Sequence, residues 1–251
     1  MRTIYGALFA LMLLAAPAAA SDGKQAAAAA AEAAQALKRH AAHVAAAGKR
    51  LDLTVAPASE HFRRVFDAKS FAELPPAAAS DMEWITDWIG AVSTANHTLY
   101  DFGADPRRPQ PDPAVLARNV RGYEDQMTVA NIFQQRLFPR MLESGYEFLA
   151  SLPEAERTPV RLKGLAGVVV NYLDTIRGSI CFAGDNTIKP ANARMIAAAV
   201  RESIDIWSEY VEDDMRKQFI SVLITAQQQT KDEETAEHFR VIQAALEAAK
   251  S

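Results

Sequence analysis

The spacing of apolar side chains between residues 113 and 150 limits the possible folds of this chain more than any other feature. These side chains recur at alternating intervals of four and three, in a seam formed by Leu116, Val120, Tyr123, Met127, Ala130, Gln134, Leu137, Met141, Ser144 and Phe148. Such a heptad period is typical of a helix that lies along a partner helix. Asp112 and Pro113 supply an N-cap and a first-turn proline, so one long helix is expected. Pro139 lacks a backbone donor and should bend it near Gln135.

The remainder of the chain carries the same kind of periodicity. Apolar stripes predict further helices over residues 84–99, 159–182, 191–211 and 233–249. Ser80 and Glu83 form a capping box, which predicts the start of the first of these helices. No stretch shows the strict alternation of a half-buried strand. We therefore predict an all-α fold, an antiparallel helical bundle of about seven helices with a long kinked central helix.

The amino-terminal residues 1–20 have the order of a secretory signal peptide. Arg2 gives a positive start, 13 residues from Ile4 to Ala16 are nearly all apolar, and small residues at 18–20 offer a cleavage site. The apolar run covers only about 20 Å as a helix, too little to span a bilayer. Later in the chain, no run reaches the roughly 18 apolar residues of a membrane span. We expect a soluble bacterial protein, exported to the periplasm or the medium.

Two segments follow the predicted cleavage site. Residues 21–56 are expected to form an alanine-rich helix or flexible arm, weakly docked because alanine buries little area. Residues 57–251 are expected to form the helical bundle domain. Beyond Arg2 there are 26 basic and 31 acidic residues, a formal charge of −5, so nucleic acid is a poor partner. Cys181 is the only cysteine, which excludes an intramolecular disulfide.

One short motif invites an enzymatic interpretation. Glu143-Ser144-Gly145-Tyr146 resembles the Glu-Ser start of the motif in lytic transglycosylases, an all-α family that cleaves peptidoglycan. The resemblance implies that Glu143 would act as general acid and then base on a glycosidic bond, in a poorly solvated setting. The family continues with a Gly-Leu-Met-Gln segment, whereas the nearest match, 164–167, lacks the methionine and the glutamine. Glu143 therefore has a second interpretation, as an exposed glutamate on a continuing helix.

A stripe of small and polar residues offers a different candidate site. Gly164, Gly167, Asn171, Asp174 and Gly178 are spaced three and four apart within the helix predicted over 159–182. Gln134 lies on the heptad seam of the preceding helix, with Asn131 three residues earlier and Gln135 next to it, and Asn96 continues an apolar face of the helix predicted over 84–99.

Polar groups on core-facing stripes cost about 1–3 kcal/mol each unless they are hydrogen-bonded. Asn96, Asn131, Gln134, Asn171 and Asp174 are thus candidates to line a binding pocket between helices. The alternative is structural: these groups bond to one another, and the glycines allow helices to approach closely.

The histidines and acidic residues predict no metal site and no cofactor. His40 and His43 could share a helix face, but two imidazoles make an incomplete zinc site. We predict a non-catalytic binding or interaction module whose partner is a protein or a small ligand. The alternative is a lytic transglycosylase-like enzyme that uses Glu143.

Overall fold

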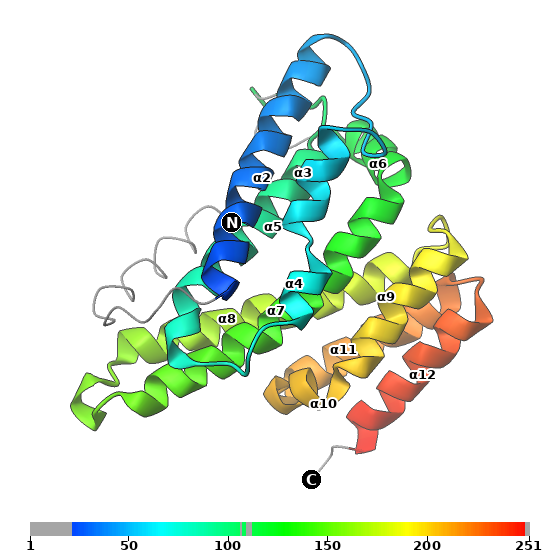
Figure 1. The fold of residues 1–251 in the computed structure, drawn as a ribbon. Helices are drawn as coiled ribbons and strands as arrows, with labels where there is room; N and C mark the ends of the chain where they lie inside the picture. The colour runs from blue at the N-terminus through cyan, green and yellow to red at the C-terminus, as the bar shows by residue number, and fades with distance from the viewer. Residues whose placement is uncertain (1–21, 106, 109–111, 249–251) are drawn as a thin grey trace. The chain divides into compact units, whose positions relative to one another are not determined.

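The computed structural model of this chain describes residues 22–105, 107–108 and 112–248. The predicted signal peptide, residues 1–20, lies outside this range. Every regular element in the described ranges is a helix, which confirms the all-α prediction (Figure 1). None of the described helices is both long enough and apolar enough to cross a membrane.

The chain divides into two compact units. Unit 1 comprises Met1–Val120 and Arg140–Val168, and unit 2 comprises Arg121–Pro139 and Val169–Ser251. Residues on both sides of the boundary expected at position 56 belong to unit 1. The two longest described helices, α7 (Glu124–Ser151) and α8 (Pro159–Gly184), each contain residues of both units.

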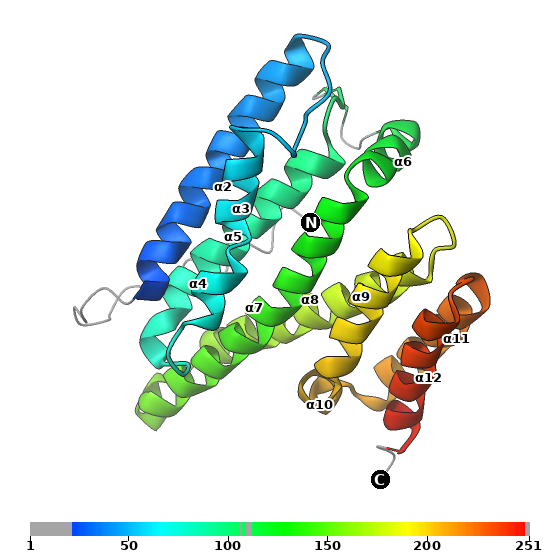
Figure 2. The ribbon, with the colours of Figure 1, turned by 45° about the vertical axis from the view of Figure 1, so that its right-hand side comes forward.

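Unit 1 is built around α5 (Met82–Tyr100). It also holds parts of α7 and α8 and four other α-helices, α2 (Asp22–Ala46), α3 (Ala58–Val65), α4 (Ala68–Ala72) and α6 (Pro113–Gly122). Helix α2 lies along α5, and α3 contacts both of them (Figures 1 and 2). The indole N–H of Trp88 on α5 donates to the carbonyl of Val65 at the end of α3, 2.8 Å away, and so ties these two helices together.

The alanine-rich segment is packed more closely than its small side chains led us to expect. One face of α2 is buried, at Ala27, Ala30, Ala33, Ala34, Leu37 and Ala41. Large side chains of α5, Trp84 and Trp88 among them, are also buried. A Cβ atom at Gly23 would lie 2.7 Å from the Trp84 ring, so only glycine fits there without a shift. Small side chains on one helix and large ones on the other thus permit a close, well-filled contact.

An ion pair with little solvent exposure joins the start of α5 to α7 within unit 1. Arg140 donates to Asp81 over 3.0 Å, and their side chains are only 12% and 8% exposed. Asp81 also accepts from the Trp84 indole N–H and the Ala78 amide. Asp81, and not the expected Ser80, is the N-cap residue of α5, but its side chain makes no capping hydrogen bond to that helix. Its carboxylate instead accepts from the Ala78 amide, at the start of the 3-10 turn Ala79–Asp81.

The long helix predicted from residue 113 to 150 is broken at Tyr123. The seam is buried in α7 at Met127, Ala130, Leu137, Met141 and Ser144, but Leu116 in α6 is 38% exposed. The Asn119 side chain donates to the carbonyls of Tyr100 and Phe102 at the end of α5. Glu124, five residues later, is instead held by the residues before and within α9. Two anchors so close together interrupt the helix, where Gly122 also lowers helix propensity.

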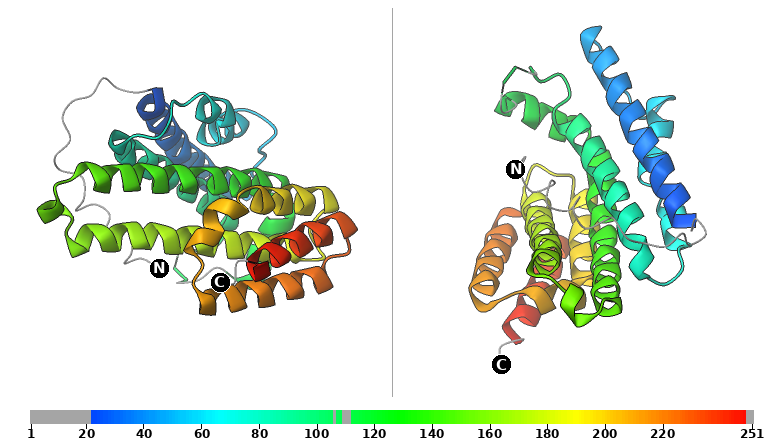
Figure 3. Two further views of the ribbon diagram at one scale, coloured as in Figure 1. Left: turned by 90° about the horizontal axis from the view of Figure 1, so that it is seen from below. Right: turned by 90° about the vertical axis from the view of Figure 1, so that its left-hand side faces the viewer.

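Unit 2 contains the first part of α7, the last part of α8 and the carboxyl-terminal helices α9 (Pro190–Glu202), α10 (Ile204–Trp207), α11 (Asp213–Gln229) and α12 (Glu233–Ala248). Helix α12 lies beside both α9 and α11 (Figures 2 and 3). The core of unit 2 includes a stacked pair, Phe138 and Tyr172, with ring centres 5.5 Å apart. Burial raises the pKa of Tyr172 to about 12.

The helix predicted over 191–211 ends earlier than expected, at Glu202. The Ser203 hydroxyl donates to the carbonyls of Ala199 and Val200, and the Trp207 indole N–H also donates to Val200. Ala199 still accepts from the Ser203 backbone N–H, whereas the Val200 carbonyl accepts from side-chain donors, where a continuing helix would supply the next backbone N–H.

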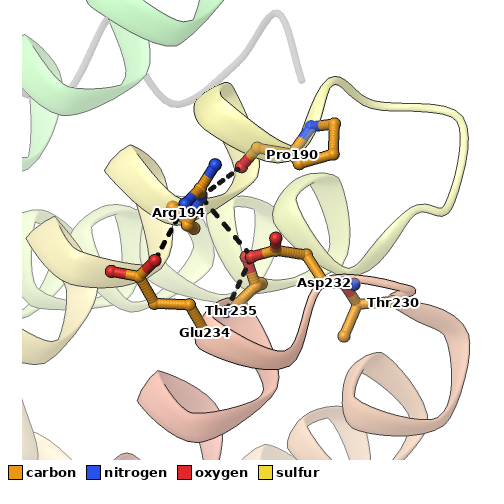
Figure 4. Close-up of polar contacts among 6 residues, drawn as sticks. All are labelled: Pro190, Arg194, Thr230, Asp232, Glu234 and Thr235. Carbon is orange, nitrogen blue, oxygen red and sulfur yellow. Dashed lines mark hydrogen bonds and ion pairs between the residues drawn. The ribbon is translucent and has the colours of Figure 1, made fainter.

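The turn between α11 and α12 is bound to α9 by charged groups (Figure 4). Arg194 donates to Glu234 over 2.9 Å and lies 3.6 Å from Asp232. Asp232 also accepts from the amide and hydroxyl of Thr235, and its carboxylate thereby caps the start of α12. One acidic residue therefore both caps α12 and faces the cation of α9.

We predict that Gly184→Ala destabilises the protein by about 1–3 kcal/mol. Its Cβ would lie 2.6 Å from the Cβ of Ala226 and 2.8 Å from that residue's Cα, and backbone cannot move as easily as a side-chain tip. Gly178→Ala in the same helix is the control. No atom lies within 4 Å of its Cβ position, so this change should stabilise by about 0.5–1 kcal/mol. Urea unfolding measures both; equal effects would contradict the close contact.

We predict that Asp81→Asn costs about 3 kcal/mol of folding free energy, because it leaves the Arg140 charge without its carboxylate in a mostly buried position. Asp174→Asn breaks an ion pair of similar length, 2.8 Å to Arg177, whose side chains are 57% and 49% exposed. That loss should stay below about 0.5 kcal/mol. Thermal unfolding of the two variants measures the difference, and similar losses would refute the distinction.

Candidate functional site

The residues predicted to bind a ligand are divided between the two units. Asn96 and Glu143 belong to unit 1, whereas Asn131, Gln134, Asn171 and Asp174 belong to unit 2. Asn96 is half-buried on α5. Asn131 and Gln134 lie on α7 and Asn171 and Asp174 on α8, all within unit 2.

Glu143 lies on the solvent-exposed side of α7, and its neighbour Ser144 is fully buried. The general acid of a glycosidase needs a poorly solvated setting that favours its protonated form. An exposed helical carboxylate does not have this setting. The placement of Glu143 therefore fits its structural interpretation better than its catalytic one.

Two of the predicted residues belong to a hydrogen-bonded series between α7 and α8. Gln135 Nε2 donates to Asn131 Oδ1 over 2.7 Å and to Ser179 Oγ over 3.2 Å. The series then continues along α8, from Ser179 to the Thr175 carbonyl and from Thr175 to the Asn171 carbonyl. Gln135 is 2% exposed and Ser179 is fully buried. The side chains of Asn131, Gln135 and Ser179 bond to one another, which favours a packing role for these three. Asn171 takes part only through its backbone carbonyl, and the buried Gln135 Oε1 has no hydrogen-bond partner among the described residues.

Gln135 and Ser179 are the central residues of this series, and neither was among the predicted binding residues. The sequence carries a signal for both. Polar residues recur every four positions at 131 and 135, and again at 171, 175 and 179. Such spacing places them on one helix face. Gln134, which lies on the heptad seam, is only half-buried. The buried residue is the next one, Gln135.

Among the remaining members of the predicted stripe, Asp174 and Gly178 are exposed, and Gly164 and Gly167 are half-buried. Asp174 is exposed and pairs with Arg177 one turn later. No atom lies within 4 Å of the Cβ position of Gly167 or Gly178, so these glycines do not mediate close helix contacts. That role belongs to Gly184 and, against Leu165, to Gly145.

A second polar cluster fixes the turn before α9. The buried Glu124 carboxylate accepts from the Lys189 amide and from Asn192 Nδ2, over 2.8 and 2.7 Å. Asp125 accepts from Asn192 and from the Lys189 ammonium, both over 2.7 Å. These donors all bind one oxygen of each carboxylate, Glu124 Oε1 and Asp125 Oδ1. Among the described residues, no three His, Cys, Asp or Glu side chains are grouped closely enough to hold a metal ion.

Another candidate site lies in unit 1, in a shallow groove at the surface of α2 and α3. Four alanines of α2, between positions 29 and 36, line it together with polar side chains. The polar side chains are Glu32, Gln35 and Arg39 from α2 and His61 and Arg64 from α3. The segment of α2 from 29 to 39 is about 15 Å long. Because alanine side chains are short, the groove stays open to side chains from a partner.

The two arginines of this groove have no acidic partner among the described residues. Arg39 and Arg64 are exposed and form no ion pair there, although Glu32 lines the same groove. Several arginines elsewhere bind a carboxylate, Arg140, Arg194 and Arg240 among them, whereas others, such as Arg201, also form no ion pair among the described residues. The groove thus presents guanidinium groups that are available to an anion.

The surrounding segment is positively charged although the chain as a whole is acidic. Between residues 33 and 66 there are six Lys or Arg residues and two Asp or Glu, a formal charge of +4, against −4 for the whole chain. Three of the five histidines, at positions 40, 43 and 61, lie in the same segment. This local charge asymmetry was visible in the sequence, but the net charge concealed it.

Comparisons with protein families, with curated proteins and with solved structures found no match for this chain. The site is therefore defined by its own geometry and charge.

We predict that Asp125 contributes stability at neutral pH that is lost in acid. Hydrogen bonds from Asn192 and then from Lys189 lower the pKa of Asp125 below its ordinary value. A depressed pKa stabilises the fold above the ordinary value of about 4 and stops doing so as the pH falls through the folded-state pKa. The bond to Asp125 likewise raises the pKa of Lys189, so the pair also weakens in strong alkali.

Urea unfolding of wild type and Asp125→Asn from pH 2 to 8 measures this contribution. The difference between them should be largest near pH 7 and shrink below pH 4. Thr187→Ala, a change of an exposed uncharged side chain in the same turn, should shift stability equally at every pH. A difference between wild type and Asp125→Asn that did not vary with pH would contradict the assignment.

Proposed function

We propose that this chain is an exported, non-catalytic binding protein, and that unit 1 carries its binding surface at the α2–α3 groove. The observation that carries the proposal is the presence of Arg39 and Arg64 in one open groove, neither of them ion-paired among the described residues. The groove residues include no nucleophile held next to a base. Electrostatic attraction between the guanidinium groups and an anionic partner is the interaction that the site supports best.

The signal peptide expected at residues 1–20 supports export, in a bacterium to the periplasm or the medium. Removal of that segment would leave α2, which begins at Asp22, at the start of the mature chain. The groove residues of α2 would then follow the new amino terminus by only a few positions, but they would still belong to a packed helix. A processed protein would therefore retain the whole site.

The proposal includes the antiparallel bundle expected from the sequence. Helices α11 and α12 contact each other and are joined by only three residues, 230–232, which favours antiparallel packing. Pro139 lies inside α7 and removes one backbone hydrogen bond there, which favours a bend in this central helix.

We predict that the mature protein, from residue 21, binds poly-L-glutamate in low salt. Arg39→Gln with Arg64→Gln should weaken binding about fivefold, since each exposed charge contributes a few tenths to about 1 kcal/mol. Arg201→Gln, which removes an exposed charge on α9, is the control. Isothermal titration calorimetry in 50 and 300 mM salt measures these affinities.

Binding to poly-L-glutamate should fall with rising salt, because exposed charges are screened. Equal affinity of the Arg39, Arg64 double variant and the Arg201 control would remove the groove from the proposal. No binding by wild type in low salt would refute the proposed function.

A further inference from the structure

We propose that the α2–α3 groove recognises an acidic helical segment of a partner protein, with carboxylates gathered on one face. This inference rests on the proposed binding function and names the class of ligand. It follows from the shape of the groove, the identity of its lining residues and the sign of its charge.

The shape of the groove favours a rod-like ligand. Two helices form it, and the lining residues of α2 extend over about 15 Å, the length of about ten helical residues. An amphipathic helix laid into a groove is a recurrent mode of peptide recognition. The alanines of α2 leave room for such a helix to approach closely, as they already do where the opposite face of α2 packs on α5.

The charge of the groove favours carboxylates. Arg39 projects from α2 and Arg64 from α3, so cations come from both helices that form the groove. Planar guanidinium groups bind carboxylates through paired hydrogen bonds. On a ligand helix, acidic residues three and four positions apart lie on one face and can reach both cations. Gln35 adds an amide that can donate to or accept from the same ligand.

A membrane surface fits the same residues less well. Binding to anionic lipid requires large apolar side chains that enter the bilayer next to the cations. The groove is lined by alanines and polar groups, and Val55 is the only strongly exposed large hydrophobic residue described in α2, α3 and their connection.

The test compares two helical peptides of 18 residues made of the same numbers of Ala, Gln and Glu. One has its glutamates on a single face, at intervals of four and three, and the other has them distributed around the axis. Affinities for the mature protein are measured by fluorescence anisotropy in low salt. Poly-L-glutamate and vesicles containing 30% anionic phosphatidylglycerol are measured in parallel.

The single-face peptide should bind at least about fivefold more tightly than its isomer. The double variant Arg39→Gln, Arg64→Gln should abolish this preference. The double variant Arg39→Lys, Arg64→Lys should retain part of it, because the charge remains. The control Arg201→Gln should leave the preference intact. All variants change exposed side chains, and unaltered thermal unfolding confirms that each remains folded.

Equal affinity for the two peptides, with arginine-dependent binding of poly-L-glutamate, would overturn this inference and leave the proposed function standing. Arginine-dependent binding to vesicles that exceeds binding to the single-face peptide would also overturn it, in favour of a lipid surface. Absence of binding to poly-L-glutamate and to both peptides would overturn the inference together with the function.

Discussion

The close contact between α2 and α5 is the interaction on which unit 1 depends. One face of α2 consists almost entirely of alanine, and a Cβ at Gly23 would meet the ring of Trp84. The buried tryptophans of α5 supply the volume that the alanines lack. Close packing of unlike side chains gives dispersion contacts throughout the interface. Other alanines of α2, at positions 29, 31 and 36, line the groove, and their short side chains leave it open.

Buried polar groups in each unit mainly form hydrogen bonds and ion pairs that hold one helix to another. Asp81 with Arg140 fixes the start of α5 to α7, and Glu124 with Asn192 fixes the start of α7 to α9. In a poorly solvated setting such groups lower the stability of the fold when they have no partner. When they are paired, they favour one arrangement of the helices over others. The groove cations differ because they are exposed and form no ion pair among the described residues, although Glu32 lines the same groove. This contrast separates the candidate binding residues from the structural ones.

The site was harder to anticipate than the fold. Five residues were candidates from their polar character on apolar stripes, and the four of them in unit 2 differ in burial and in partners. Asn131 enters a hydrogen-bonded series with Gln135, whereas Asp174 faces solvent beside Arg177. A stripe on a helical wheel identifies which residues share a face but not which face is covered, because coverage depends on partners distant in sequence. The groove required α2 and α3 to lie together, and neither helix predicts this alone.

The sequence by itself determined the helical class of this protein, most of its helix positions and the seam of α7, because hydrophobic period and capping residues act over a few neighbouring positions. It also determined the local positive charge of residues 33–66. Only the tertiary structure decided that Tyr123 interrupts a long helix, that the alanine-rich segment is firmly packed, and that Arg39 and Arg64 line one groove. Each of these depends on contacts between residues far apart in the chain, where the shape and charge of the partner outweigh local preference.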